Sequence, residues 1–287
     1  MRTSRNLLFF LLPATILVGI FVYCFAAWTG YLSLTDWRGI GHFGEFIGFS
    51  NYESLFQNSV AMNALVNTLV LAVAFIVVTT AWGLGVAILL EMGFKGAGLM
   101  KAICLLPLSF SFVVSATMWT WMFAPVQGTL NTLLRMLQLG FLCQPWITSP
   151  SESLFCVLIV YVWQFSGFVT LIYFAGIRAV PQEFLEAAEI DGASTFQKYR
   201  NIVVPLQKGE TVGVVTILLF YALRVFDLVY LMTGGGPALS SEVLATYMYR
   251  VTFNQNLFAY GASVGFLLFI LAMAIMIPFL YLTGRGR

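Results

Sequence analysis

The chain has 287 residues, of which 60% are hydrophobic and 9% are charged, and its formal net charge is +2. This composition excludes an ordinary soluble domain, which needs a charged surface, and the small net charge argues against a nucleic-acid partner. Long stretches carry no charge at all, among them those between Arg5 and Asp36, Lys101 and Arg135, Glu152 and Arg178, and Arg250 and Arg285. Each can hold the roughly 20 apolar residues that cross a bilayer as a helix.

We therefore predict an all-α, polytopic membrane protein with about six transmembrane helices, in which residues 1–287 form a single transmembrane domain. An outer-membrane barrel would show shorter strands of alternating hydrophobicity. The first span resembles a signal peptide because Arg2 and Arg5 precede it, but its apolar run exceeds the usual signal core of about 7–15 residues, so we predict an uncleaved anchor. The predicted spans lie near 7–28, 65–90, 103–124, 153–177, 211–232 and 262–283.

Lysine and arginine predict the orientation, because cytoplasmic loops of membrane proteins are enriched in both. With the N-terminus inside, three of these residues fall in outer segments, namely Arg38, Arg135 and Arg250. Ten fall in cytoplasmic segments: Arg2, Arg5, Lys95, Lys101, Arg178, Lys198, Arg200, Lys208, Arg285 and Arg287. We predict that both termini are cytoplasmic, in agreement with an even number of spans.

The outer segments offer helices and breakers but no metal site. We expect a short amphipathic helix over 129–139, a breaker cluster over 233–237 and a second helix lying on the surface around 242–252. His42 is the only histidine, and no two cysteines form a CxxC pair, so we predict no metal centre.

The fourth predicted span carries a polar and aromatic cluster over residues 163–168. Ser166 and Gly167 suit close packing of helices, which is the structural interpretation. Gln164 and Phe168 combine a planar hydrogen-bonding group with an aromatic face, and a sugar site needs both. A role in a substrate pathway therefore stays open for this cluster.

The longest predicted cytoplasmic loop, 178–210, is expected to form two short helices joined by a bend. Pro181 suits a helix start, and residues 182–190 are mostly good helix formers. Gly192 permits a turn, and we expect Pro205 to end the second helix. The first helix is acidic and partly apolar, which favours docking into a groove of a protein over lying on anionic lipid headgroups.

Arg224 and Asp227 lie within the predicted fifth span, three residues apart and therefore on one face of a helix. Charges inside the membrane are costly, and they face a cavity or each other. Two interpretations stay open. The residues have a structural role, as an ion pair or as charges in the outer half of the span that reach water, or Arg224 lines a pathway and donates to a solute while Asp227 restrains it.

At the 178–210 loop the sequence resembles the transmembrane subunits of bacterial ABC importers. Their signature is Glu-Ala-Ala, three residues, Gly, nine residues and Ile-x-Leu-Pro. Its spacing is matched by Glu186-Ala187-Ala188, Gly192, Ile202 and Pro205, with Val204 where leucine is common. Further similarity to the carbohydrate group lies at Gly48–Tyr52, Leu106-Pro107, Trp119, Met122-Phe123, Gly128, Asn131, Phe226-Asp227 and Thr233–Pro237.

The resemblance implies a type I ABC importer permease fold in the bacterial cytoplasmic (inner) membrane. The chain would form half of the translocation pathway of an ATP-driven, binding-protein-dependent importer for a sugar or sugar-like solute. The implied partners are a second permease subunit, two cytoplasmic ATPase subunits and an extracytoplasmic substrate-binding protein. The chain has no phosphate-binding loop, so ATP and Mg would bind the partner subunits, and the chain would be neither an enzyme nor a cofactor carrier by itself.

The resemblance also assigns residues. The helix that docks into an ATPase subunit would be formed by Glu186, Ala187, Ala188, Asp191 and Gly192. The substrate pathway would involve Gln164, Gly167, Phe168, Tyr221, Arg224, Val225 and Asp227. Because Asp227 belongs to a pattern common in the family, a general structural role is favoured for it.

Three other functions are compatible with a polytopic membrane protein. An ion-coupled secondary transporter commonly shows inverted repeats, and we detect none. An intramembrane enzyme needs a nucleophile with a base or paired metal ligands, which His42 in an outer loop does not provide. Import of an osmolyte, a polyol or a phosphorylated polyol stays open, because the selectivity of a binding protein is not encoded in this chain.

Overall fold

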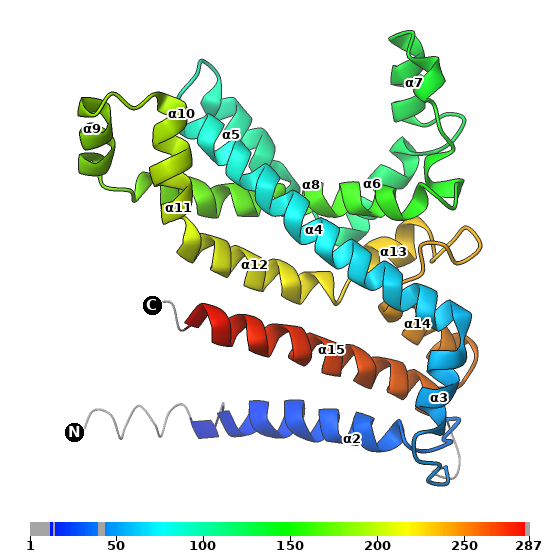
Figure 1. The fold of residues 1–287 in the computed structure, drawn as a ribbon. Coiled ribbons are helices and arrows are strands. Elements are labelled where there is room, and N and C mark those ends of the chain that lie inside the picture. Colours follow the sequence, from blue (N-terminus) through cyan, green and yellow to red (C-terminus); the bar gives the residue numbers. More distant parts are fainter. Residues whose placement is uncertain (1–11, 14, 40–43, 285–287) are drawn as a thin grey trace, which may run out of the picture. The chain divides into compact units, whose positions relative to one another are not determined.

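A computed structural model describes residues 12–13, 15–39 and 44–284. Four of its helices are long and apolar enough to cross a membrane: Thr15–Leu32, α4 (Ser59–Glu91), α8 (Ser153–Arg178) and the Phe258–Tyr281 part of α15 (Phe258–Gly284) (Figure 1). The first of these includes a π-helical turn, η1 (Gly19–Cys24), and α2 (Phe25–Leu32). Residues 7–11 and 14 of the predicted first span, like His42, lie outside the described residues.

Two further pairs of helices are apolar enough to span a membrane but are strongly bent. The first pair comprises α5 (Ala97–Leu105) with the 3-10 turn η2 (Leu106–Ser109), followed by α6 (Phe112–Met122) at an angle of 109°. The second comprises Thr195–Leu206, followed by α12 (Lys208–Ala222) at 61°. If each pair counts as one span, the described chain has up to six, and the prediction of an all-α fold is confirmed.

The remaining helices are short and connect these spans. In chain order they are α3 (Ser50–Gln57), α7 (Thr129–Met136), η3 (Gly140–Leu142), η4 (Trp146–Thr148), α9 (Gln182–Ile190), α10 (Thr195–Lys198), η5 (Tyr199–Val203), α11 (Val204–Leu206), α13 (Asp227–Met232), α14 (Leu244–Tyr249) and η6 (Arg250–Asn254). The predicted helix over 129–139 corresponds to α7. The helix expected around 242–252 corresponds to α14 and η6, but Leu244 and Tyr247 are buried, so it does not lie on the surface as predicted.

The contacts group the chain into two compact units, Met1–Met62 with Leu244–Met273 and Asn63–Val243 with Ala274–Arg287. In the first unit, Asn51 stabilises the end of the first span because its side-chain amide donates to the carbonyls of Ser33 and Thr35, both at 2.8 Å. Gly30 lies directly against the ring of Phe266. The prediction of a single domain over 1–287 stays a prediction.

In the second unit, α8 is the helix on which the others pack. Two glycines allow the close approach of its neighbours: a Cβ on Gly83 of α4 would meet the side chain of Val169, and one on Gly167 of α8 would meet the backbone carbonyl of Cys104. Small residues at helix crossings serve this purpose in membranes. Gly167 therefore has a packing role, as the structural interpretation of its sequence predicted.

The predicted third span, 103–124, is wrong as a continuous helix. The chain leaves helical geometry at Phe110 and Ser111, after the turn that contains Pro107. The carbonyls freed by the break accept hydrogen bonds from the side-chain amide of Gln164, at 2.8 Å to Pro107 and 2.8 Å to Phe110. A break within a membrane span is tolerated where such groups are satisfied again by the protein.

The predicted fifth span, 211–232, is also wrong as a continuous helix. It ends at Ala222, and α13 begins at Asp227 after a four-residue connection. At the end of α12 the carbonyl of Tyr221 accepts a hydrogen bond from the hydroxyl of Tyr161, at 2.7 Å, besides one from the N–H of Arg224, at 3.1 Å. Helix α8 thus stabilises both breaks with side chains one turn apart, Tyr161 and Gln164.

Candidate functional site: a cavity between two broken spans and an exposed helix

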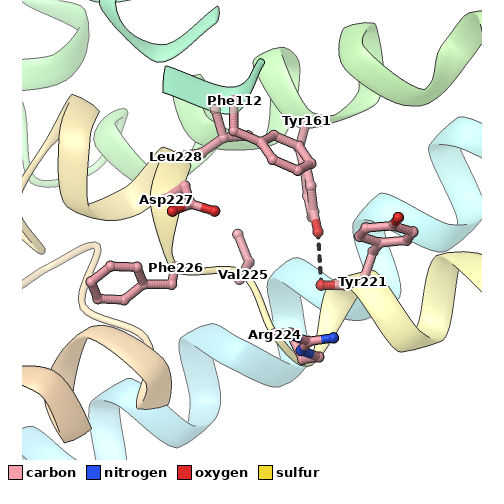
Figure 2. A pocket seen from close by; sticks show the side chains of 8 residues that line it. All are labelled: Phe112, Tyr161, Tyr221, Arg224, Val225, Phe226, Asp227 and Leu228. Carbon is pink, nitrogen blue, oxygen red and sulfur yellow. Dashed lines mark hydrogen bonds between the residues drawn. The ribbon is translucent and has the colours of Figure 1, made fainter. Parts of the chain in front are cut away.

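A cavity of about 160 Å³ lies between the two breaks. Its lining comes from the start of α6, the middle of α8, the end of α12 and the connection to α13, and comprises Phe112, Tyr161, Tyr221, Arg224, Val225, Phe226, Asp227 and Leu228. Figure 2 shows Phe112 and Tyr161 on one side of this space and Arg224 on the other, with Val225 and Asp227 between them in this view.

Arg224 and Asp227 form no ion pair within the part of the chain that the structure describes, and they do not share a helical face. Arg224 lies in the connection after α12, whereas Asp227 is the first residue of α13. The Arg224 guanidinium lies over the ring of Phe220, 4.8 Å from its centroid. The interpretation of a structural ion pair is therefore wrong, because the break in the fifth span separates the two side chains.

Each charge instead has its own local environment. Arg224 gains from the electron-rich face of Phe220. Asp227 lies in the first turn of α13, where a negative charge interacts favourably with the exposed amides of a helix start. Both residues are exposed in this chain, so the guanidinium and the carboxylate are free to contact a solute in the cavity. Hydroxyl groups can both donate to a carboxylate and accept from a guanidinium.

The structure brings together four of the seven predicted pathway residues: Tyr221, Arg224, Val225 and Asp227 all line the cavity. The other three do not. Gln164 is buried and bonded to the third-span break, Gly167 packs against α5, and Phe168, although half-buried, is not among the lining residues. The prediction missed the lining residues Phe112, Tyr161, Phe226 and Leu228. Of these, Tyr161 had a sequence signal, since it lies three residues before Gln164 on the same helix face.

The helix predicted from the importer signature is α9, and its end explains the spacing of that signature. Gly192 has a positive φ of +78°, a conformation that side chains disfavour. The Gly192 N–H donates to the carbonyl of Glu189 at 3.0 Å, and the Ala193 N–H donates to that of Ala188 at 2.9 Å. These two bonds define a Schellman helix end, which requires glycine four residues after the accepting alanine.

Helix α9 presents a surface that nothing in the described chain covers. Ile190 is 87% exposed and Phe184 52% exposed, and the acidic side chains of Glu183 and Glu186 are exposed beside them. Figure 1 shows α9 set apart from α4, α5 and α8 of the same unit. Exposed large apolar residues on a short, well-defined helix are typical of a protein interaction site.

The bend after α9 is stabilised from both sides. Ser194 and Gln197 form a capping box at the start of α10, and Lys198 forms an ion pair with Glu189 at 3.1 Å, across the bend. Pro205 does not end the second helix, contrary to the prediction. The wide π-helical turn η5 precedes Pro205 and accommodates its missing N–H, so that helix continues to Leu206.

The docking region is directly connected to the spans that carry the cavity. The second helix meets α12 at Gln207, a buried residue that lies against Gly176 of α8. One turn away, the hydroxyl of Tyr173 donates to the side chain of Thr211 on α12, at 2.9 Å. The helices that follow α9 are therefore in contact with both α8 and α12.

Comparison with known proteins decides the family. The family model described as "Binding-protein-dependent transport system inner membrane component" matches residues 80–283, which include both the docking helix and the cavity. The chain belongs to this family. As its description says, such permeases are components of the inner membrane and act with a substrate-binding protein.

Relatives and solved structures agree with this assignment. A probable ABC transporter permease of Pyrococcus horikoshii is 42% identical and covers 100% of this chain and 99% of its own. The xylose/arabinose import permease XacH of Haloferax volcanii is 35% identical over 93% of this chain and 84% of its own. The fold matches a bacterial ABC transporter involved in import of the acidic polysaccharide alginate, with a TM-score of 0.84 and 23% identity over 99% of this chain and 96% of that chain.

The family assignment and the shared fold confirm the predicted ABC importer permease.

Proposed function

We propose that this permease forms half of the pathway of an ATP-driven importer for a sugar or sugar-like solute, and that the cavity between the two broken spans contacts the solute. The single observation that carries the proposal is one cavity that combines aromatic walls with the guanidinium of Arg224 and the carboxylate of Asp227, neither of which forms an ion pair among the described residues. Sugars are recognised by polar groups that bind hydroxyls and by aromatic faces that cover C–H surfaces. The import of xylose and arabinose by a relative supports this solute class.

The partners follow from the architecture. This chain lines one cavity, and a second permease subunit would complete the pathway. The exposed apolar and acidic surface of α9 would dock into a cleft on a cytoplasmic ATPase subunit, and two such subunits would bind ATP and Mg. This chain would bind no cofactor and catalyse no reaction by itself.

The same proposal fixes the orientation. Six spans, an even number, would place both termini on one side of the membrane. The excess of lysine and arginine assigns that side, and the docking loop 178–210, to the cytoplasm.

Coupling would use α9 as a lever. Closure of the ATPase subunits moves α9, and the contacts of Tyr173 with Thr211 and of Gly176 with Gln207 transmit the movement to α8 and α12. Because α8 also stabilises both span breaks through Tyr161 and Gln164, the cavity changes its walls as the helices rotate. Alternating access through a two-state rearrangement of helices is a general mechanism of transport.

The test is uptake of labelled xylose and arabinose into vesicles that contain the assembled importer, its binding protein and ATP. Arg224→Ala should reduce uptake by about tenfold or more, because a charge-assisted hydrogen bond contributes about 1.5–3 kcal/mol. The quantity of assembled complex should stay unchanged, since the Arg224 side chain forms no ion pair within the described chain. Equal losses of uptake and of complex would contradict a solute contact, and uptake of a phosphorylated polyol such as glycerol 3-phosphate in place of the sugars would contradict the solute class.

A further inference from the structure

Gln164 uses its whole carboxamide on the break in the third span. Its side chain is 6% exposed. The Nε2 group donates to the carbonyls of Pro107 and Phe110, and Oε1 accepts from the hydroxyl of Ser115. A carboxamide has two N–H donors, and both are used here. Gln164 therefore has no donor left for a solute, which sets it apart from Arg224.

The break that Gln164 stabilises determines one wall of the cavity. Phe112 is the first residue of α6 after the break, and its ring lies 6.3 Å from the ring of Tyr161 and 6.1 Å from that of Phe165. If the backbone at Phe110 and Ser111 changed conformation, the start of α6 would turn and Phe112 would leave the lining. The opposite wall is stabilised separately, by the bond from Tyr161 to the carbonyl of Tyr221.

We propose that Gln164 is a positioning residue for the solute cavity. It does not contact the solute. It fixes the third-span break so that Phe112 forms a wall opposite Val225 and Asp227, and it thereby sets the width of the space that a solute enters. The inference deepens the proposed function and rests on it.

The experiment measures the two walls separately in the full chain, expressed with its partner subunits in membrane vesicles. The four native cysteines, Cys24, Cys104, Cys143 and Cys156, are replaced by alanine. Phe112→Cys then reports on the third-span wall, and Val225→Cys, in a second chain, reports on the fifth-span wall. The probe is the water-soluble thiol reagent 2-(trimethylammonium)ethyl methanethiosulfonate. The measured quantity is the ratio of the two modification rates.

Gln164→Leu replaces the carboxamide with an apolar side chain of similar size and so removes all three hydrogen bonds. We expect it to change the ratio at least about fivefold, because each bond contributes roughly a factor of two to ten. Ser115→Ala, which removes one of the bonds, should change the ratio in the same direction by less. Ser166→Ala is the matched control, since the Ser166 hydroxyl bonds only to Trp163 in its own helix, and it should leave the ratio unchanged.

Gln164→Glu adds a signature that a general loss of stability would not give. A protonated glutamic acid can donate to one of the two carbonyls and an ionised one to neither, so the ratio should return toward that of Gln164 as the pH is lowered. The Gln164→Leu ratio should show no such return.

An unchanged ratio of modification rates in Gln164→Leu would overturn the proposal. If uptake were lost at the same time, the result would indicate that Gln164 contacts the solute directly. If Gln164→Leu does not insert, the comparison of Ser115→Ala with Ser166→Ala decides, and equal ratios would overturn the proposal. The measurement needs no transport, so its failure is distinguishable from failure of the proposed function, which the Arg224→Ala uptake assay tests.

Discussion

The helix end at Gly192 offers the sharpest test of the docking helix. Its φ of +78° costs a non-glycine residue about 1–2 kcal/mol, with asparagine the least disfavoured. Nothing lies within 4 Å of a Cβ built on Gly192, so a substitution there acts through the backbone alone. Gly192→Asn should therefore keep a population of the capped bend close to that of the unsubstituted chain. Gly192→Ala should lower this population by about 5–30-fold relative to other backbone conformations.

Gly192→Pro should have the largest effect. Proline fixes φ near −65°, about 140° away from the observed angle, and it removes the N–H that donates to Glu189. Helix α9 would then lose its defined direction relative to α10. The assay is the ATPase activity of the reconstituted complex with and without the binding protein. We expect stimulation to decrease in the order Asn, Ala, Pro at constant complex yield. Full stimulation of an intact Gly192→Pro complex would refute the role of the bend in coupling.

Three further predictions concern packing and the span breaks. Gly167→Ala should lower the thermal midpoint of the complex, because its Cβ would meet the Cys104 carbonyl and overpacking costs about 1–3 kcal/mol. Gly213→Ala is the control and should leave the midpoint unchanged, since nothing lies within 4 Å of a Cβ built there. Equal midpoints of the two variants would contradict the packing role of Gly167. Tyr161→Phe should lower the midpoint by less, since the Tyr221 carbonyl loses one of two donors, at a cost of about 0.5–1.5 kcal/mol, and keeps the N–H of Arg224; an unchanged midpoint would contradict a role of Tyr161 at the break. Asn131→Ala should speed proteolysis of the 125–152 segment from outside, because Asn131 bonds to the carbonyls of Pro125 and Gln144 and to the indole of Trp146; an unchanged cleavage rate would contradict this.

The sequence predicted best those features that depend on neighbouring residues. The apolar runs located α4, α8 and α15, since crossing a bilayer requires length and hydrophobicity alone. The bend at Gly192 was predictable because a left-handed conformation is a local property of glycine.

The two span breaks were not predictable because their stabilising groups are distant in sequence. Gln164 is 57 residues from Pro107, and Tyr161 is 60 residues from Tyr221. The connection over residues 223–226 contains no glycine or proline, so no breaker signal marked it. A sequence without a breaker predicts a continuous helix, and a continuous helix would place Arg224 and Asp227 on one face.

The same reasoning explains why the cavity was found only in part. Tyr221, Arg224, Val225 and Asp227 were identified from one span, whereas Phe112 reaches the cavity only because the third span bends by 109°. The prediction that Pro205 ends the second helix is wrong for a related reason. The π-helical turn that accommodates it depends on the local hydrogen-bond register, which the residue type does not reveal.

The most direct test of the account is purification of the tagged chain from its own membranes in mild detergent, with the copurifying proteins identified and their ATPase activity measured with and without the binding protein. The account predicts recovery of a second permease and an ATPase subunit, with activity that the binding protein stimulates and that Gly192→Pro uncouples. Recovery of the chain alone, with solute flux that needs no ATP, would contradict it.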